Sequence, residues 1–209
     1  AGGHPADSTT DALIRLLRRG QFSDGRWVTP VRPPSEASVF TATAVSMRGI
    51  QLYGNPRSAA DQAAIASAAA WLRKSTPRNT EDATFRLLGL EWAHAPAEER
   101  RAAIDALVAA QKPDGGWAQL DYRASDAYAT GQVLVALHEA GVPVKSPAYQ
   151  RGVRYLLDTQ LVDGSWLVPT RTLPTQTYFE SGFPHGAHQF ISAAGTQWAT
   201  QALAWSVRR

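Results

Sequence analysis

A seven-residue pattern, Q-x-x-D-G-x-W, constrains this chain more than any other feature because it occurs three times. Each copy follows an apolar run with helical spacing: QFSDGRW at 21–27, QKPDGGW at 111–117 and QLVDGSW at 160–166. A missing copy near Trp71 would give a period of about 45 to 50 residues. A period of that size indicates stacked supersecondary units.

Eight segments are predicted to be helices from the spacing of their apolar residues. They cover residues 11–21, 38–54, 58–75, 80–93, 96–111, 125–141, 146–160 and 195–207. Amphipathic segments alternate with segments rich in small apolar residues, and the heptapeptides follow amphipathic ones. We therefore predict four helical hairpins, each with an outer amphipathic helix and an inner helix that is covered on both sides. The expected fold is all-α, an α/α toroid or solenoid, with at most a minor strand at residues 166–174.

The heptapeptides are predicted to be structural rather than catalytic. Their glycines suit a positive φ in the turn, and their aspartates suit capping of the turn amides. Each tryptophan buries an apolar ring whose indole N–H needs an acceptor, and each glutamine can hydrogen-bond a neighbouring helix end. We expect these residues to join one hairpin to the next. They are Gln21, Gly25, Trp27, Gln111, Gly115, Trp117, Gln160, Gly164 and Trp166.

Length and composition exclude several classes of protein. A chain of 209 residues suits one domain, here 1–209, with a flexible N-terminus at 1–10 and a long aromatic loop at 167–194. The net charge of +3 comes from scattered basic residues, so we expect no nucleic-acid partner. No apolar run is long enough for a transmembrane helix. With no cysteine, the chain has no thiolate metal site, and we expect no metal and no cofactor.

The repeated heptapeptide resembles the QW motif of squalene-hopene cyclases, oxidosqualene cyclases and related prenyltransferase-like repeats. The resemblance covers residues from about 11 to 207, which is nearly the whole chain. It implies an α/α-toroid fold and an isoprenoid substrate class. Full-length cyclases of this kind join two toroids, whereas this chain accounts for about four hairpins. Protein prenyltransferase β-subunits are related but bind zinc partly through a cysteine, which this chain lacks.

The same resemblance directs attention to acids at the start of two inner helices. Class II cyclases protonate a polyprene with the central Asp of a DxDD motif. In DAYA, Asp126 stands at the first position, but Tyr128 and Ala129 replace the other acids. The chain thus resembles a branch without an intact DxDD motif.

NTED is a closer match, with Asn79, Glu81 and Asp82 at the acid positions. A carboxylic acid that protonates an alkene needs a polarising neighbour in a dry pocket. The candidate catalytic acids are therefore Asp82, Asp126 and Glu81. The alternative is that they are surface acids at helix starts.

The stretch from Thr170 to Trp198 departs most from the repeat and is dense in aromatic residues. Loops of this length are usually functional or disordered, and this one is too aromatic for disorder. Three interpretations stay open: a plug at the end of the ring with histidines at its rim, the lining of an apolar pocket, or a metal or acid–base site at His185, His188 and Glu180. The candidate ligand-binding residues are Tyr128, Tyr178, Phe179, Phe183, His185, His188, Phe190 and Trp198.

These observations favour a binding domain over a class II cyclase. The ligand would be an apolar, isoprenoid-like molecule, a partner protein, or both, and a neighbouring domain or a homo-oligomer is a further partner to consider. The first alternative is an active terpenoid or polyprenyl cyclase, an isomerase or lyase. The second is a polysaccharide lyase on an α/α toroid, with Tyr178, Arg171 and His185 as candidates. SDAYATG and YFESGFPHG resemble segments of bacterial extracytoplasmic proteins, which implies a periplasmic or secreted location.

Overall fold

The computed structural model describes residues 5, 7–29, 38–171 and 178–206. Eight α-helices and a short 3₁₀ helix, η1 (Gly186–His188), make up its regular structure. The α-helices are α1 (Ser8–Arg19), α2 (Val39–Tyr53), α3 (Ala59–Lys74), α4 (Thr80–Trp92), α5 (Ala97–Ala109), α6 (Ala127–Glu139), α7 (Pro147–Thr159) and α8 (Gln189–Ser206). Each corresponds to one of the eight predicted helices. The described part of the predicted strand, 166–171, is not a strand, and 172–174 lie outside the described residues.

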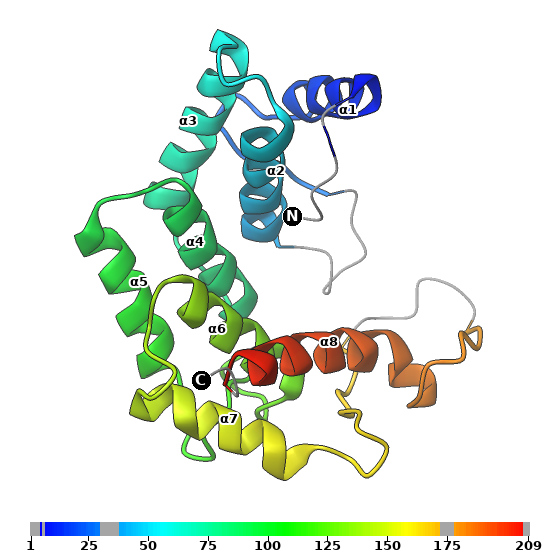
Figure 1. The fold of residues 1–209 in the computed structure, drawn as a ribbon. Coiled ribbons are helices and arrows are strands. Elements are labelled where there is room, and N and C mark those ends of the chain that lie inside the picture. Colours follow the sequence, from blue (N-terminus) through cyan, green and yellow to red (C-terminus); the bar gives the residue numbers. More distant parts are fainter. Residues whose placement is uncertain (1–4, 6, 30–37, 172–177, 207–209) are drawn as a thin grey trace.

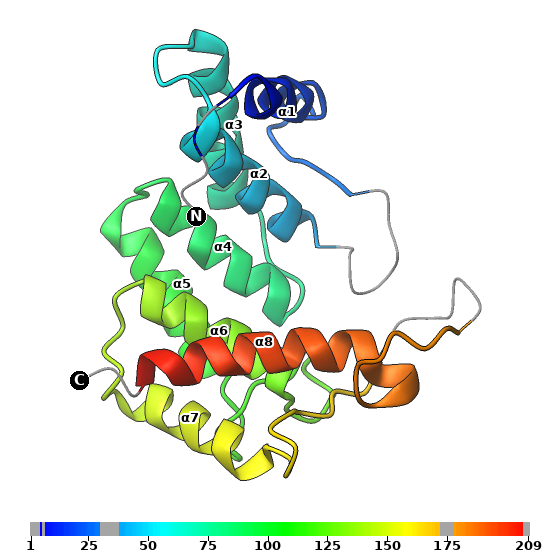
Figure 2. The ribbon, with the colours of Figure 1, turned by 45° about the vertical axis from the view of Figure 1, so that its right-hand side comes forward.

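The helices form four hairpins of an α/α toroid-type fold. The inner helices pack in chain order, with α2 against α4, α4 against α6, and α6 against α8. Outer helices lie behind them, and α3 contacts both α2 and α4 just as α7 contacts both α6 and α8. Figures 1 and 2 show the hairpins following one another along an arc, with α1 and α2 at one end and α7 and α8 at the other. The predicted alternation of inner and outer helices is therefore confirmed.

The inner helices are rich in small residues because they are packed from several sides. In α6, every residue from Ala129 to Leu137 is buried. A Cβ on Gly131 would lie 2.6 Å from the backbone carbon of Trp198, so α6 and α8 approach too closely there for a larger residue. The large buried side chains include Trp117, Trp166 and Tyr149. Burial raises the pKa of the Tyr149 hydroxyl to about 12.

Each of the first three inner helices begins with a side-chain cap. Ser38, Asn79 and Asp126 precede α2, α4 and α6, and each accepts a hydrogen bond from a backbone N–H in the first turn. Such caps satisfy amides that have no partner within the helix. They also fix where the neighbouring polar side chains of each first turn lie.

Two predicted boundaries differ from the structure. α1 begins at Ser8, within the segment 1–10 that was expected to be flexible, because Asp7 and Thr10 form a reciprocal capping box. Residues 1–4 and 6 lie outside the described residues. α8 begins at Gln189, inside the predicted loop 167–194, because FISAAG continues the apolar helical spacing toward the N-terminus. None of the described helices combines the length and apolarity needed to cross a membrane.

Candidate functional site

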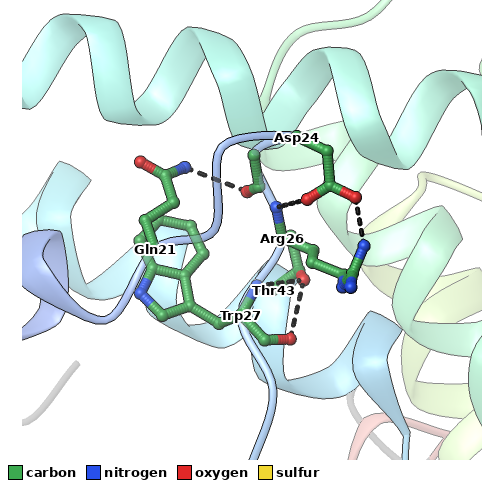
Figure 3. A network of polar contacts seen from close by, with 6 residues as sticks. Gln21, Asp24, Arg26, Trp27 and Thr43 are labelled. Atoms are coloured by element: carbon green, nitrogen blue, oxygen red, sulfur yellow. Dashed lines mark hydrogen bonds and ion pairs between the residues drawn. The ribbon is translucent and has the colours of Figure 1, made fainter.

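The three heptapeptides form turns of the same geometry, which we call Gln–Trp turns 1, 3 and 4 after the hairpins they belong to. In turn 1, the side-chain amide of Gln21 donates to the carbonyl oxygens of Gly25 and Ala64, each over 2.9 Å. The Trp27 indole donates to the Leu17 carbonyl over 2.7 Å. Figure 3 shows this turn, with the Trp27 backbone held by the Thr43 hydroxyl of α2. The turn thus joins α1, α2 and α3.

Turn 3 repeats these contacts one by one. Gln111 donates to Gly115 over 2.7 Å and to Ala148 of α7 over 2.8 Å. The Trp117 indole donates to Leu107 over 2.7 Å, and the Trp117 N–H donates to a threonine of the inner helix. Gly25, Gly115 and Gly164 have φ values of 99°, 87° and 83°, as predicted for glycine. The aspartates accept from turn amides, also as predicted. Ala148 is the second residue of α7, so Gln111 bonds a neighbouring helix end as predicted, whereas Gln21 bonds Ala64 inside α3.

Hairpin 2 has no Gln–Trp turn, and charged side chains of other elements occupy its place. Leu72 of α3 stands where Leu17, Leu107 and Leu156 accept an indole N–H, and its carbonyl instead accepts from Arg86 Nε over 3.1 Å. Arg73 pairs with Glu99 of α5 at 2.5 Å, so an ion pair replaces the glutamine contact. The absent turn leaves a hollow of about 430 Å³, lined by Ala70, Arg73, Lys74, Arg86, Glu99 and Ala102.

The candidate acids meet at the starts of the inner helices, which we call the acid cluster (Glu81, Asp82 and Asp126 with their partners). All three are buried, with exposed fractions of 7% for Glu81, 0% for Asp82 and 8% for Asp126. The prediction that they belong to helix starts is confirmed, but the alternative that they are surface acids was wrong. They are buried because side chains brought together by the fold, among them Ser38, Thr41 and Gln119, cover them.

Asp82 and Asp126 are held on both carboxylate oxygens. Asp82 Oδ1 accepts from the Ser38 hydroxyl over 2.7 Å, and its Oδ2 accepts from the Arg78 backbone N–H over 3.1 Å. Asp126 Oδ1 accepts from the Ala129 N–H and its Oδ2 from the Gln119 amide, each over 2.9 Å. Burial raises the pKa of the Asp126 carboxyl, whereas these hydrogen bonds lower it. Both carboxyls therefore serve the starts of α4 and α6.

Glu81 has a different environment because its partners are hydroxyl groups. Its Oε1 accepts from Thr41 of α2 over 2.9 Å, and its Oε2 accepts from the Tyr128 hydroxyl over 3.4 Å. Burial raises the pKa of the Glu81 carboxyl, and the Thr41 hydrogen bond and the charge of Arg171 act against that rise. Burial also raises the pKa of Tyr128 strongly, so its hydroxyl remains a donor to Glu81.

Several residues of this cluster were not among the predicted site residues. Thr41 and Gln119 contact the acids directly, and Arg171 Nε donates to Gln119 Oε1 over 2.7 Å. From the sequence, Arg171 was a candidate residue of the polysaccharide lyase alternative. Thr41 lies in the first turn of an inner helix, which is the signal that could have found it. Gln119 follows a Gln–Trp turn but has no distinguishing pattern.

The aromatic segment, residues 178–190, does not form a plug. Tyr178, Phe179, Phe183 and Phe190 are all about half-exposed, at 50–56%. Phe179 and Phe190 contact each other with ring centroids 5.5 Å apart. Gln189 fixes the backbone, since its amide oxygen accepts from the Ser181 N–H and its nitrogen donates to the Phe179 carbonyl. Trp198, in contrast, packs in the interior against Phe85 at 6.4 Å.

The two histidines of this segment contact the preceding stretch, residues 165–170, at different residues. His185 Nε2 lies 2.8 Å from the Ser165 hydroxyl, and His188 Nδ1 accepts from the Thr170 N–H over 3.1 Å. Glu180 accepts from the Tyr178 hydroxyl over 2.6 Å. Within the described part of the chain, no three histidine or acidic side chains gather in a way that could hold a metal ion.

The lyase interpretation needs Tyr178, Arg171 and His185 to act together. Each of them has its own partner, namely Glu180, Gln119 and Ser165. These contacts give the lyase interpretation no support.

Comparisons with known proteins agree with the fold. Residues 78–208 match the family model described as the squalene-hopene cyclase C-terminal domain. A squalene–hopene cyclase of Bradyrhizobium diazoefficiens is 39% identical over an alignment of 109 residues, and the match covers 44% of this chain and 15% of that protein. A labda-7,13-dienyl diphosphate synthase of Streptomyces clavuligerus is 33% identical over 96 residues, 46% of this chain and 15% of the synthase. The matched regions thus span about 15% of the length of these curated relatives.

Proposed function

Because this chain belongs to the family of squalene-hopene cyclase C-terminal domains, we propose that it binds an apolar, isoprenoid-like ligand and does not by itself carry out class II cyclisation. The observation that carries this proposal is the engagement of Asp82 and Asp126. Their four carboxylate oxygens accept hydrogen bonds from protein donors, two of which are backbone amides of helix starts. Because both carboxyls already stabilise helix starts, we do not assign them proton transfer. Ligand binding beside them needs no such chemistry.

The aromatic segment supplies the apolar surface for such a ligand. Four half-exposed aromatic rings in one short segment are more than single scattered apolar residues on a protein surface. Aromatic faces give a large contact area for isoprenoid methyl groups. Arg171, which precedes the segment in the chain, contacts Gln119 of the acid cluster. We place the ligand against this segment, beside the starts of the inner helices.

Native mass spectrometry of the purified protein, with lipid extraction, tests the proposal directly. We expect an isoprenoid to be released, and we expect added squalene to change the tryptophan fluorescence. The double variant Phe179→Ser, Phe183→Ser should lose this binding. Tyr122→Ser is the matched control, because Tyr122 is 84% exposed and lies outside the aromatic segment. If wild-type protein neither carries nor binds an isoprenoid, the proposal fails.

Glu81 supports a second candidate function, that of an active cyclase with Glu81 as the proton donor. Its carboxyl is buried, burial raises its pKa, and it accepts hydrogen bonds from the side-chain hydroxyls of Thr41 and Tyr128 rather than from backbone amides. A carboxyl that retains its proton is the requirement for acid catalysis. Conversion of squalene or a shorter polyprene by wild type but not by Glu81→Gln would establish this function. Glu98→Gln, an exposed change in α5, serves as the control.

A further inference from the structure

Gln–Trp turn 4 has the geometry of turns 1 and 3, but no outer helix of the described chain lies beyond it. Gln160 donates to the Gly164 carbonyl over 2.9 Å, and the Trp166 indole donates to the Leu156 carbonyl over 2.9 Å. These bonds match those within the other two turns. Among the described residues, however, Gln160 makes no bond like that of Gln21 to Ala64 or of Gln111 to Ala148.

The surroundings of the turn glycines also distinguish turn 4 from turns 1 and 3. A Cβ on Gly25 would lie 2.2 Å from the Ser67 carbonyl oxygen, and one on Gly115 would lie 2.7 Å from the Arg151 carbonyl oxygen. The backbone of an outer helix therefore rests directly on each of these glycines. At Gly164 the nearest described atom is the turn's own Gln160 Nε2, at 4.0 Å.

We propose that turn 4 is a docking seat for the outer helix of a further helical hairpin, one that the four hairpins described here do not supply. The two occupied seats define what such a helix carries. Ala64 and Ala148 accept the glutamine amide, and four residues later stand Ala68 and Gly152, both buried. The occupant thus presents small residues at positions i and i+4, with the carbonyl of residue i directed at Gln160.

The surface around turn 4 suits an apolar partner. Leu157, Leu161 and Val162 border the turn and are exposed by 56%, 43% and 109%. Exposed apolar side chains gathered at one place typically mark an interaction surface. On the adjoining face of α8, Thr200 is exposed, whereas Leu134, at the corresponding position of α6, is buried beneath α7.

A second copy of this chain is a poor occupant because its free outer helix, α1, lacks the small residue. Ala68 and Gly152 stand four residues before Leu72 and Leu156, and Leu13 stands four residues before Leu17. A Cβ on Gly152 would already lie 2.9 Å from the Trp117 ring. Leucine at that position would collide with Trp166 in turn 4, which corresponds to Trp117.

A helix added at the C-terminus tests the docking seat, and its sequence is taken from the helix that already packs on turn 3. A copy of residues 140–160, the connection and helix that occupy turn 3, is added after Arg209. We expect a higher melting temperature, by at least about 2 °C, and slower amide exchange across residues 160–166. The matched control carries Ala148→Leu and Gly152→Leu in the appended copy only, and we expect it to show neither effect. Gln160→Ala should reduce the gain of the fusion while changing the unextended protein little.

Two results would overturn the proposal. The first is that the fusion and its leucine control behave alike in melting and in exchange across the turn. The second is that the unextended protein self-associates in sedimentation and Leu13→Asp abolishes this association, because the occupant would then be a second copy.

Discussion

The side-chain amide of Gln111 reaches the carbonyl oxygen of Ala148, 37 residues later, over 2.8 Å. This bond joins the turn after α5 to the first turn of the next outer helix, α7, while the Trp117 indole ties the same turn back to Leu107. One short sequence pattern thereby connects two successive hairpins. The stability of the stack should therefore depend on how fully each turn is engaged.

Gln111→Ala should destabilise the protein more than Gln160→Ala. Gln111 is half-buried and donates to two carbonyls, whereas Gln160 is exposed and donates to Gly164. A lost hydrogen bond costs about 1 kcal/mol, and more when a buried partner is left without one. We expect roughly 1–3 kcal/mol for Gln111→Ala and less than about 1 kcal/mol for Gln160→Ala. Equilibrium unfolding in urea measures both, and equal losses would contradict the difference in engagement.

The turn glycines offer a second comparison, between Gly115→Ala and Gly164→Ala. Both residues have positive φ, which costs a residue with a side chain roughly 1–2 kcal/mol. At Gly115 the new methyl group would also lie 2.7 Å from the Arg151 carbonyl oxygen, whereas at Gly164 the nearest atom, Gln160 Nε2, would lie 4.0 Å away. We expect Gly115→Ala to be the more destabilising change by at least about 1 kcal/mol. Thermal unfolding monitored by circular dichroism checks the order, and the reverse order would be inconsistent with the packing of α7.

The local parts of this structure were predictable from sequence because they depend on neighbouring residues. The eight helices follow from apolar spacing, and the positive φ of Gly25, Gly115 and Gly164 follows from the turn pattern. Parts that depend on distant residues were not predictable. At Leu72 the carbonyl accepts from Arg86 in place of the missing indole N–H, and no local sequence pattern predicts this contact.

The burial of the acids depends on distant residues in the same way. Asp82 and Glu81 are recognisable as helix-start acids, but the hydroxyls that cover them, Ser38 and Thr41, come from another hairpin. The exposure of the aromatic segment was equally unpredictable, since its composition suits a buried plug and an exposed surface alike. Each of these features depends on which distant segments pack together in the folded chain, and not on the preferences of the neighbouring residues.

Asparagine should be a milder replacement for Asp126 than alanine. Its Oδ1 accepts from the Ala129 N–H at the start of α6, and an asparagine oxygen can accept the same bond. Asp126→Ala removes the cap and leaves the Gln119 amide without its acceptor, so we expect a loss of about 1–2 kcal/mol. Asp126→Asn keeps the cap but puts an N–H group where Oδ2 stood, so the Gln119 amide loses its acceptor here as well, and we expect a smaller loss of about 1 kcal/mol. Paired urea titrations measure both variants, and equal losses would contradict the role of Asp126 as the cap of α6.

Glu81 should give the stability of the protein a pH dependence of defined sign. Burial raises the pKa of its carboxyl above the ordinary value of 4.5, so the folded state holds this proton more tightly than the unfolded state does. The resulting stabilisation is fully present below the unfolded pKa and is lost as the pH rises through the folded pKa. Glu81→Gln removes this dependence while keeping an oxygen that can accept from Thr41. The stability of this variant relative to wild type should therefore be greater at neutral pH than at acidic pH.

The measurement is the free energy of unfolding of wild type and Glu81→Gln at a series of pH values from about 4 to about 8. The difference between the two proteins isolates Glu81 from the other titrating groups, among them Asp126, whose pKa burial also raises. A carbon-13 titration of the Glu81 carboxyl gives the folded-state pKa directly. A midpoint at or below 4.5 would show that Arg171 and the hydroxyl donors outweigh burial, and Glu81 would then hold no proton to donate near neutral pH.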